Sequence, residues 1–252
     1  MFGDNIKLVR SEELGKLSWD SSDNSVNNGW GVNEWSQADL KEYLNTMYYG
    51  GTSVTCYFGN NNSTTTCPTN SLNATAKSMI DYHVWNTGAI NLEDTTIVNL
   101  ETFAVNTVSF YNAERGSENG KICTSGTGCN DTVERTTTWP GYVALPYATD
   151  WAYASSETAC ATNMNDGYDA ANDNYDNMTC KKNNWMHHGS TMWMLSPLAR
   201  FGVACRVWAV YGDGIVADGD ASLALSVFPS VYLNTEVKIT SGSGTSSDPY
   251  IL

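Results

Sequence analysis

The chain has little charge and few groups suited to acid–base chemistry. Charged residues make up 16% of its 252 residues, and 27 acidic residues against 13 basic ones give a formal net charge of −14. Such a surface repels nucleic-acid phosphates, which argues against DNA or RNA as a partner. Histidine is also scarce: there are three, and two of them are the adjacent His187 and His188. General bases for catalysis are therefore few.

Long apolar runs and familiar catalytic motifs are missing as well. No run of about 18 apolar residues occurs, so the sequence predicts no membrane span. It contains no nucleophile elbow, phosphate-binding loop, dinucleotide fingerprint or metalloprotease helix. The first residues do not form a signal peptide, but a strand predicted at residues 6–9 suggests that more chain precedes this point. These features favour binding over catalysis.

Cysteine, in contrast, is well represented with seven residues. Six form three short-range pairs that each bracket a polar loop: Cys56–Cys67, Cys123–Cys129 and Cys160–Cys180. Loops with so few apolar residues gain most from a disulfide, which predicts an oxidising, extracellular or cell-surface location. Zinc fits less well, because no Cys-x-x-Cys pair occurs. Six cysteines allow about fifteen pairings, and Cys205 is left over.

The loop between Cys160 and Cys180 is acidic and rich in asparagine. Its four aspartates are Asp166, Asp169, Asp173 and Asp176. Their spacing differs from that of an EF-hand loop, so a solvated polar loop is the main interpretation and a structural calcium ion the alternative. No other cofactor or metal is predicted.

Hydrophobic periodicity predicts an α+β domain spanning residues 1–252. The clearest helix follows Ser36 as N-cap, carries apolar residues at helical spacing from Leu40 to Tyr48 and ends at Gly50. His83 is expected to be a packed core histidine. Further predicted elements are helices at residues 72–82 and 95–113, the latter with strand as the alternative, a helical turn at 149–154, and strands at 6–9, 142–145 and 237–239.

Residues 193–233 are the candidate functional region. The turn Gly212-Asp213-Gly214 separates apolar residues 207–210 from residues 215–216, which predicts a β-hairpin. A core hairpin would suit the valines alone. The charged residues around it are Arg200, Arg206, Asp218 and Asp220, which a core does not need. With the nearby Trp and Tyr, they are typical of a binding surface.

Four motifs occur in order along the chain. They are Gly-Val-Asn-Glu-Trp-Ser-Gln-Ala-Asp-Leu at residues 31–40, Trp-x-Leu-Ser-Pro at 193–197, Pro-Ser-Val-Tyr-Leu at 229–233 and Gly-Thr-x-x-Asp-Pro-Tyr at 244–250. As a set that spans nearly the whole chain, they resemble the variable proteins of diversity-generating retroelements, of the cell-surface or pilin-associated type of gut bacteria. Phe228 and Ser230 depart from the family, which tends to have arginine and valine there.

The resemblance implies a C-type-lectin-type fold, with a small mixed or antiparallel sheet, two flanking helices and long disulfide-closed loops. Its C-terminal part would display a ligand-binding surface that a reverse transcriptase diversifies at adenines. The fixed anchors carried over are Trp193, Leu195, Ser196, Pro197, Trp208, Val210, Gly214, Val216, Val227, Pro229 and Tyr232. The diversified, exposed positions carried over are Met194, Leu198, Arg200, Phe201, Val203, Cys205, Arg206, Tyr211, Asp213, Ile215, Ala217, Asp218, Asp220, Leu223, Leu225 and Phe228.

The expected protein is therefore a secreted or surface-displayed binder of a protein or glycan, tethered to a pilus or cell surface through a preceding segment. One alternative is a carbohydrate-binding adhesin of fixed specificity. The other is an enzyme of the formylglycine-generating kind, which resembles this fold but depends on reactive cysteines. The binding interpretation expects three disulfides and one free thiol, at Cys205.

Overall fold

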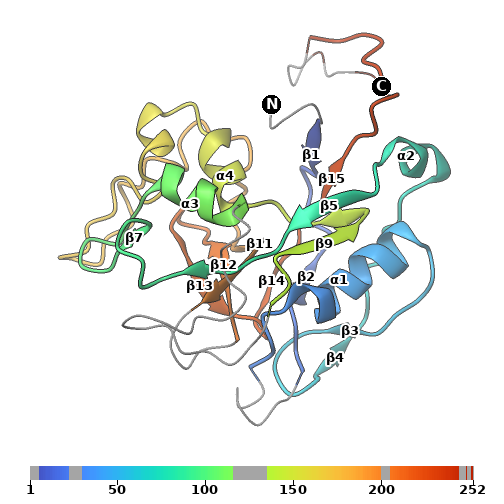
Figure 1. Ribbon diagram of the computed structural model, residues 1–252, viewed down its shortest axis with the longest axis horizontal. Coiled ribbons are helices and arrows are strands. Elements are labelled where there is room, and N and C mark those ends of the chain that lie inside the picture. Colours follow the sequence, from blue (N-terminus) through green and yellow to red (C-terminus); the bar gives the residue numbers. More distant parts are fainter. Residues whose placement is uncertain are drawn as a thin grey trace.

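The computed structural model describes residues 6–22, 30–115, 135–199, 205–243, 248 and 251. A six-stranded sheet lies at its centre, in the order β13-β12-β11-β14-β2, with β6 also paired to β11 (Figure 1). Its strands are β13 (Val216–Asp220), β12 (Arg206–Val210), β11 (Met192–Ala199), β14 (Ala224–Ser226), β2 (Lys16–Ser18) and β6 (Ile90–Asn91). β11 runs antiparallel to β12 and parallel to β14 and β6, so the sheet is mixed.

Smaller antiparallel sheets surround this one. The first has the order β1-β15-β10, and the others are the pairs β3-β4, β5-β9 and β7-β8. Their bounds are β1 (Lys7–Val9), β15 (Ser230–Tyr232), β10 (Val143–Ala144), β3 (Cys56–Tyr57), β4 (Thr64–Thr65), β5 (His83–Asn86), β9 (Thr138–Gly141), β7 (Val98–Asn99) and β8 (Ala104–Val105). The sheet β1-β15-β10 joins the beginning of the chain to its C-terminal part.

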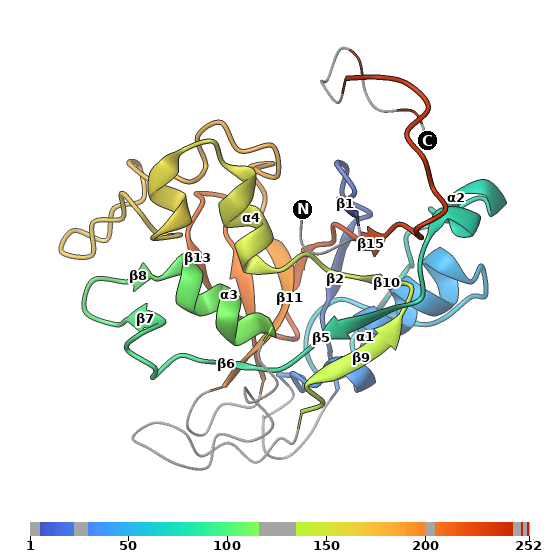
Figure 2. The same cartoon turned by 45° about the horizontal axis from the view of Figure 1, so that its top comes forward.

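Short helices flank the strands on two sides of the molecule. They are η1 (Trp35–Gln37), α1 (Asp39–Glu42), η2 (Tyr43–Tyr49), α2 (Ala74–Met79), α3 (Thr107–Arg115), α4 (Ala148–Ala154) and η3 (Thr158–Ala161). α3 and α4 lie beside β11 and β12, whereas α1 and α2 lie on the side of β2 and β15 (Figures 1 and 2). The chain is thus α+β, as predicted, with more strands than helices in its described part. No helix there is long and apolar enough to cross a membrane.

Both faces of the central sheet are covered by apolar side chains. Along β11, Trp193 and Leu195 enter the first apolar cluster, while Met192, Met194 and Leu198 enter the second. β12 divides its residues in the same way. Because neighbouring side chains of a strand point to opposite faces, the two clusters lie on opposite sides of the sheet. The two central strands therefore have no solvent face along most of their length.

The register of β11 against β12 shifts between Trp193 and Pro197, and this bulge accommodates a proline within a strand.

The motif at residues 31–40 supports the central sheet. Asn33 is fully buried, and its Nδ2 donates hydrogen bonds to the carbonyls of Leu198 at 2.8 Å and Arg206 at 2.6 Å. One amide thus satisfies carbonyls of both strands.

Several predicted elements need correction. The helix after Ser36 begins instead as the 3₁₀ turn η1, capped by the Glu34 side chain, and α1 starts only at Asp39. The helix predicted at 72–82 shortens to α2, with Asn73 as N-cap. In the segment 95–113 the predicted helix forms only from residue 107, as most of α3, and the strand alternative holds for β8. Residues 237–239 form no strand. His83 is half-buried and its ring lies tilted against that of Tyr232, with 3.8 Å between ring centroids, rather than packing in the core.

Two predicted disulfides are confirmed, Cys56–Cys67 and Cys160–Cys180. The pair Cys123–Cys129 lies outside the described residues. Cys205 is a free, buried cysteine, as expected from its lack of a partner. The strands predicted at 6–9 and 142–145 and the helical turn at 149–154 correspond to β1, β10 and α4.

Candidate functional site

The candidate site is built on the predicted hairpin of β12 and β13. The two strands pair antiparallel, with Arg206 opposite Asp220, Trp208 opposite Asp218 and Val210 opposite Val216. Side chains two residues apart lie on the same face, so one face changes from apolar near the turn to charged at the far end. The β-branched valines and the glycine turn form the hairpin, and the charged residues stand at its open end.

An ion-pair network occupies that charged end. Arg206 pairs through Nη1 with Oδ2 of Asp218, and its Nε lies 3.2 Å from Oδ1 of Asp220. Burial lowers the pKa of Arg206, but its hydrogen bond and charge interactions with the two aspartates outweigh this and raise the pKa overall. The arginine therefore remains charged. Because two carboxylates face one guanidinium, the group carries a net negative charge.

A cavity of about 360 Å³ opens beside this network. Its walls come from the segment 92–105 and from the hairpin: Leu92, Val98, Leu100, Phe103, Val105, Arg206, Trp208, Val216, Ala217 and Asp218. Leu100 and Phe103 are 43% and 37% exposed, so large apolar side chains are available at its mouth. Apolar walls with a few placed polar groups are typical of ligand pockets.

A buried asparagine holds the two halves of this cavity together. Asn165 donates through Nδ2 to the carbonyls of Phe103 at 3.0 Å and Val216 at 2.9 Å, and its Oδ1 accepts from the Val216 amide at 2.7 Å. Asn165 belongs to the loop closed by Cys160 and Cys180. The disulfide loop thus fixes the position of the wall that carries Phe103.

A row of aromatic rings extends from the cavity along the loop closed by Cys160 and Cys180. The ring of Phe103 lies 5.6 Å from that of Tyr168, which lies 5.0 Å from that of Tyr175. Both tyrosine hydroxyls donate to Oδ1 of Asp173 at 2.7 Å. These hydrogen bonds lower the pKa of Asp173 and raise that of Tyr175. The described residues contain no group of three or more potential metal ligands, the acidic loop included.

Five positions predicted to be exposed are buried, and the prediction of their exposure is wrong. They are Met194, Leu198, Cys205, Ile215 and Phe228, each at most 8% exposed. Met194 and Leu198 lie in β11, where both faces of the sheet are covered. Phe228 packs in the same cluster and stacks on His188, with 4.5 Å between ring centroids. None of the five presents a side chain to a ligand at the surface.

The other predicted binding positions divide into three groups. Arg206, Ala217 and Asp218 line the cavity. Tyr211, Asp213, Asp220 and Leu225 are half-buried and Leu223 is exposed, but none of them lines it. Tyr211 is nevertheless connected to the cavity, because its hydroxyl donates to the Asp218 carbonyl at 2.9 Å. Arg200, Phe201 and Val203 lie outside the described residues.

The predicted anchor positions share one property, burial. All of them are buried: Trp193, Leu195, Ser196, Pro197, Trp208, Val210, Gly214, Val216, Val227, Pro229 and Tyr232. Trp193 also donates from Nε1 to the Leu17 carbonyl at 2.9 Å, which ties β11 to β2. Seven of the eleven belong to the two apolar clusters: Trp193, Leu195, Trp208, Val210, Val216, Val227 and Tyr232.

The sequence prediction missed the wall contributed by residues 92–105. A helix was predicted over most of this segment, and a helix would have placed Leu100 and Phe103 on an inward face. Instead, the chain turns between β7 and β8, and Phe103 adopts φ of +57°. The one available signal is Asn99, because an asparagine side chain can accept hydrogen bonds from backbone amides two and three residues on, as this one does from Glu101 and Thr102.

The reactivity of the one free described cysteine is low. Burial and the neighbouring Asp220 raise the pKa of Cys205 to about 11. Its Sγ lies 3.7 Å from Oδ1 of Asp220. Since the thiolate is the nucleophile and metal ligand, a thiol of this pKa is nearly inert at neutral pH.

Comparison of the chain with family models, curated proteins and solved structures finds no match in any of the three.

Proposed function

We propose that this protein is an extracellular or cell-surface binding protein whose ligand, a protein or a glycan, contacts the cavity beside the β12–β13 hairpin. One observation carries this proposal: Arg206, Ala217 and Asp218, three positions expected from the sequence to vary, converge on one cavity. Arginine and exposed aromatic residues are the types that dominate binding energy. The two disulfides support an oxidising location.

The proposal includes a C-type-lectin-type fold and diversification by a retroelement. A mixed sheet with flanking short helices and disulfide-closed loops is compatible with that fold. The burial of the anchor positions supports a constant frame, and the partial exposure of Arg206 and Asp218 supports a changeable rim. The buried positions Met194, Leu198, Cys205, Ile215 and Phe228 are left out of the proposed contact surface.

Sequencing the DNA that flanks the gene tests the diversification. We expect a reverse transcriptase gene and a near copy of the codons for residues 193–233 that differs from them at adenines. Flanking DNA with neither feature would contradict diversification and leave the adhesin of fixed specificity.

The binding site itself is tested with arrays of glycans and purified surface proteins, probed with tetramers of the whole chain. Arg206→Ala/Asp218→Ala should lose signal on every spot that the unchanged protein binds, because it removes both charges from the cavity rim. A matched control, Glu236→Ala/Lys238→Ala, also removes one charge of each sign, from exposed positions. Equal loss in both variants would contradict the assignment of the site.

The pKa of Cys205 favours binding over an enzyme of the formylglycine-generating kind, which needs reactive cysteines. Thiol counting on the unreduced, denatured chain should find one free thiol. Three or more would contradict the proposed disulfide framework.

A further inference from the structure

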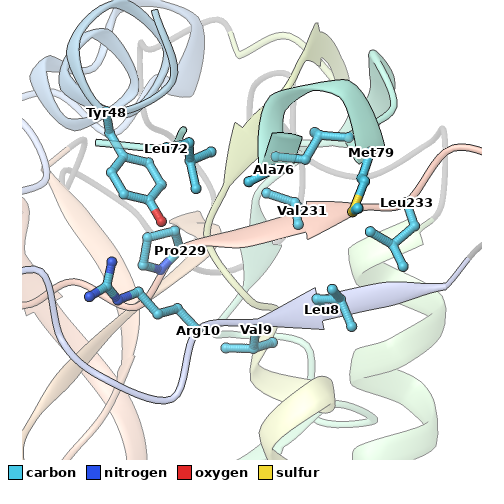
Figure 3. Close-up of a pocket in the computed structure, with 11 residues that line it drawn as sticks. Leu8, Val9, Arg10, Tyr48, Leu72, Ala76, Met79, Pro229, Val231 and Leu233 are labelled. Carbon is cyan, nitrogen blue, oxygen red and sulfur yellow. The ribbon is translucent and has the colours of Figure 1, made fainter. Parts of the chain in front are cut away.

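A second cavity, of about 270 Å³, lies in another part of the molecule, between the sheet strands β1 and β15 and helix α2 (Figure 3). It is lined by Leu8, Val9, Arg10, Tyr48, Leu72, Ala76, Met79, Ile80, Pro229, Val231 and Leu233. Apart from Arg10 and Tyr48, every lining side chain is aliphatic or a thioether. Leu8 is 39% exposed, so the cavity is open to solvent.

The two polar residues stand together at one end of this cavity. Figure 3 shows Arg10 and the hydroxyl of Tyr48 on the same side, and Met79, Leu233 and Leu8 on the other. The cavity is therefore amphipathic, with a hydrogen-bonding end and an aliphatic end. A ligand that fits must likewise have one polar end and one aliphatic end.

Tyr48 supplies a free hydrogen-bond donor at the polar end. The residue is only 4% exposed, and its hydroxyl makes no hydrogen bond with any described residue. The nearby Tyr43 hydroxyl, in contrast, donates to the Pro68 carbonyl at 3.3 Å. Its oxygen is not among the fully buried side-chain atoms that lack a partner, so it is accessible, and a ligand in the cavity can accept its hydrogen bond.

Arg10 indicates that this acceptor is negatively charged. Its side chain is 28% exposed, and among the described residues its one ion pair is a 3.5 Å contact with Glu12, whose side chain is 81% exposed. A contact of this kind stabilises little, so the guanidinium remains available to an anion. Guanidinium and hydroxyl donors together suit a carboxylate, which accepts charge-assisted hydrogen bonds from both.

We propose that this cavity binds a medium-chain aliphatic carboxylate, with the carboxylate at Arg10 and Tyr48 and the chain towards Met79 and Leu233. Scaling from a cavity of ~150 Å³ that holds one benzene ring, this one has room for roughly ten carbons. A flexible chain matches aliphatic walls better than a flat ring does. The site is separate from the hairpin cavity and does not depend on the function proposed for it.

Titration calorimetry of the whole chain with decanoate, below its micelle concentration, tests the proposal. Saturable binding at one site is expected. Arg10→Gln should weaken it about tenfold, because a charge-assisted pair is lost, and Tyr48→Phe should weaken it by a smaller factor of about three. Lys238→Gln, which removes one positive charge from an exposed position, should leave binding unchanged. Decyltrimethylammonium, with the same chain length and the opposite charge, should not bind.

A steric variant checks the location of the chain. Ala76→Phe should fill the cavity and abolish binding, whereas Thr75→Phe, on the exposed neighbouring residue, should not. Melting temperatures confirm that both variants fold. Absence of saturable binding, or equal affinity in Arg10→Gln and Lys238→Gln, would overturn the proposal. It would also be overturned by a dimer that Ala76→Phe disrupts and decanoate does not, since the cavity would then be a chain–chain interface.

Discussion

At the scale of single residues, Cys205 illustrates how environment decides reactivity. It lies at the start of the hairpin, buried, with its thiol towards the carboxylate of Asp220. Both features disfavour the thiolate, so the group remains a thiol to higher pH than usual. The cysteine left over from the disulfide framework is thus a small core residue rather than a nucleophile.

Alkylation with iodoacetamide should reveal the low reactivity of Cys205. With a pKa of about 11, roughly one thiol in a thousand is ionised at pH 8, so labelling of the folded chain should be slow. Its rate should rise with pH through about 11 rather than about 9, because the pKa is raised. Asp220→Asn should speed labelling several-fold, and Cys205→Ser provides the background. Labelling at pH 8 as fast as that of free cysteine would contradict the assignment.

At the scale of elements, β1 is held to the helices by one buried lysine. The Lys7 side chain, 6% exposed, pairs with Asp150 in α4, and its Nζ lies 4.2 Å from the centroid of the Tyr147 ring. Asp150 also accepts a hydrogen bond from the Tyr147 amide at the start of α4. The contact therefore joins an edge of the β1-β15-β10 sheet to the helical side of the molecule.

Lys7→Ala should be strongly destabilising. Removing Lys7 leaves the buried Asp150 carboxylate with the 3.6 Å contact to Arg115 as its remaining ion pair, so the cost should approach, without reaching, the ~3–5 kcal/mol of an uncompensated buried charge. The exposed Lys16 offers a matched control, and Lys16→Ala should change the free energy of unfolding by less than about 0.5 kcal/mol. Urea denaturation measures both. Similar midpoints for the two variants would show that the buried pair contributes little.

The disulfide Cys160–Cys180 closes the loop that fixes Phe103 and the hairpin. Replacing both cysteines by alanine should cost about 3 kcal/mol, the chain entropy expected for a loop of this length. Both cysteines are fully buried in the second apolar cluster, so lost packing adds to this. Hydrogen exchange of the Val216 amide, which is bonded to Asn165, should accelerate selectively. Unchanged exchange of the Val216 amide would show that the disulfide loop does not hold this wall of the cavity in place.

Local signals predicted some elements well and others poorly. The hairpin was predictable because valines flank a glycine turn, a pattern with few alternatives. The strand predicted at 237–239 failed because Val237, Lys238 and Ile239 find no partner strand in the described structure. The helix predicted over 95–113 forms only from residue 107 as α3, and the strand alternative holds at Ala104–Val105, because the helical spacing of this segment is equally compatible with a β7-β8 turn followed by a helix. Such outcomes depend on tertiary contacts that a local pattern does not contain.

At the scale of the whole molecule, the main error was one of exposure. The variable positions are carried over from the family resemblance, which gives their places along the chain but not their burial in this sheet. The central sheet is covered on both faces, so Met194 and Leu198 are core residues as much as Trp193 and Leu195 are. Alternation of polar and apolar residues disappears in such strands, and the sequence then gives no indication of which face is outer.

Burial therefore limits the positions at which this chain can tolerate varied residues. Substituting asparagine at Met194, Leu198 or Phe228 places an unsatisfied amide and a smaller side chain in the second cluster, at a cost of ~3 kcal/mol or more. The same substitution at Arg206, Asp218 or Leu223, which are partly exposed, should cost less than about 1 kcal/mol. A displayed library randomised at these six codons and sorted for protease resistance should keep diversity at the second set and return apolar residues at the first. Equal tolerance at both sets would mean that the apolar cluster around β11 does not constrain the chain, and the division into a constant frame and a variable rim would fail with it.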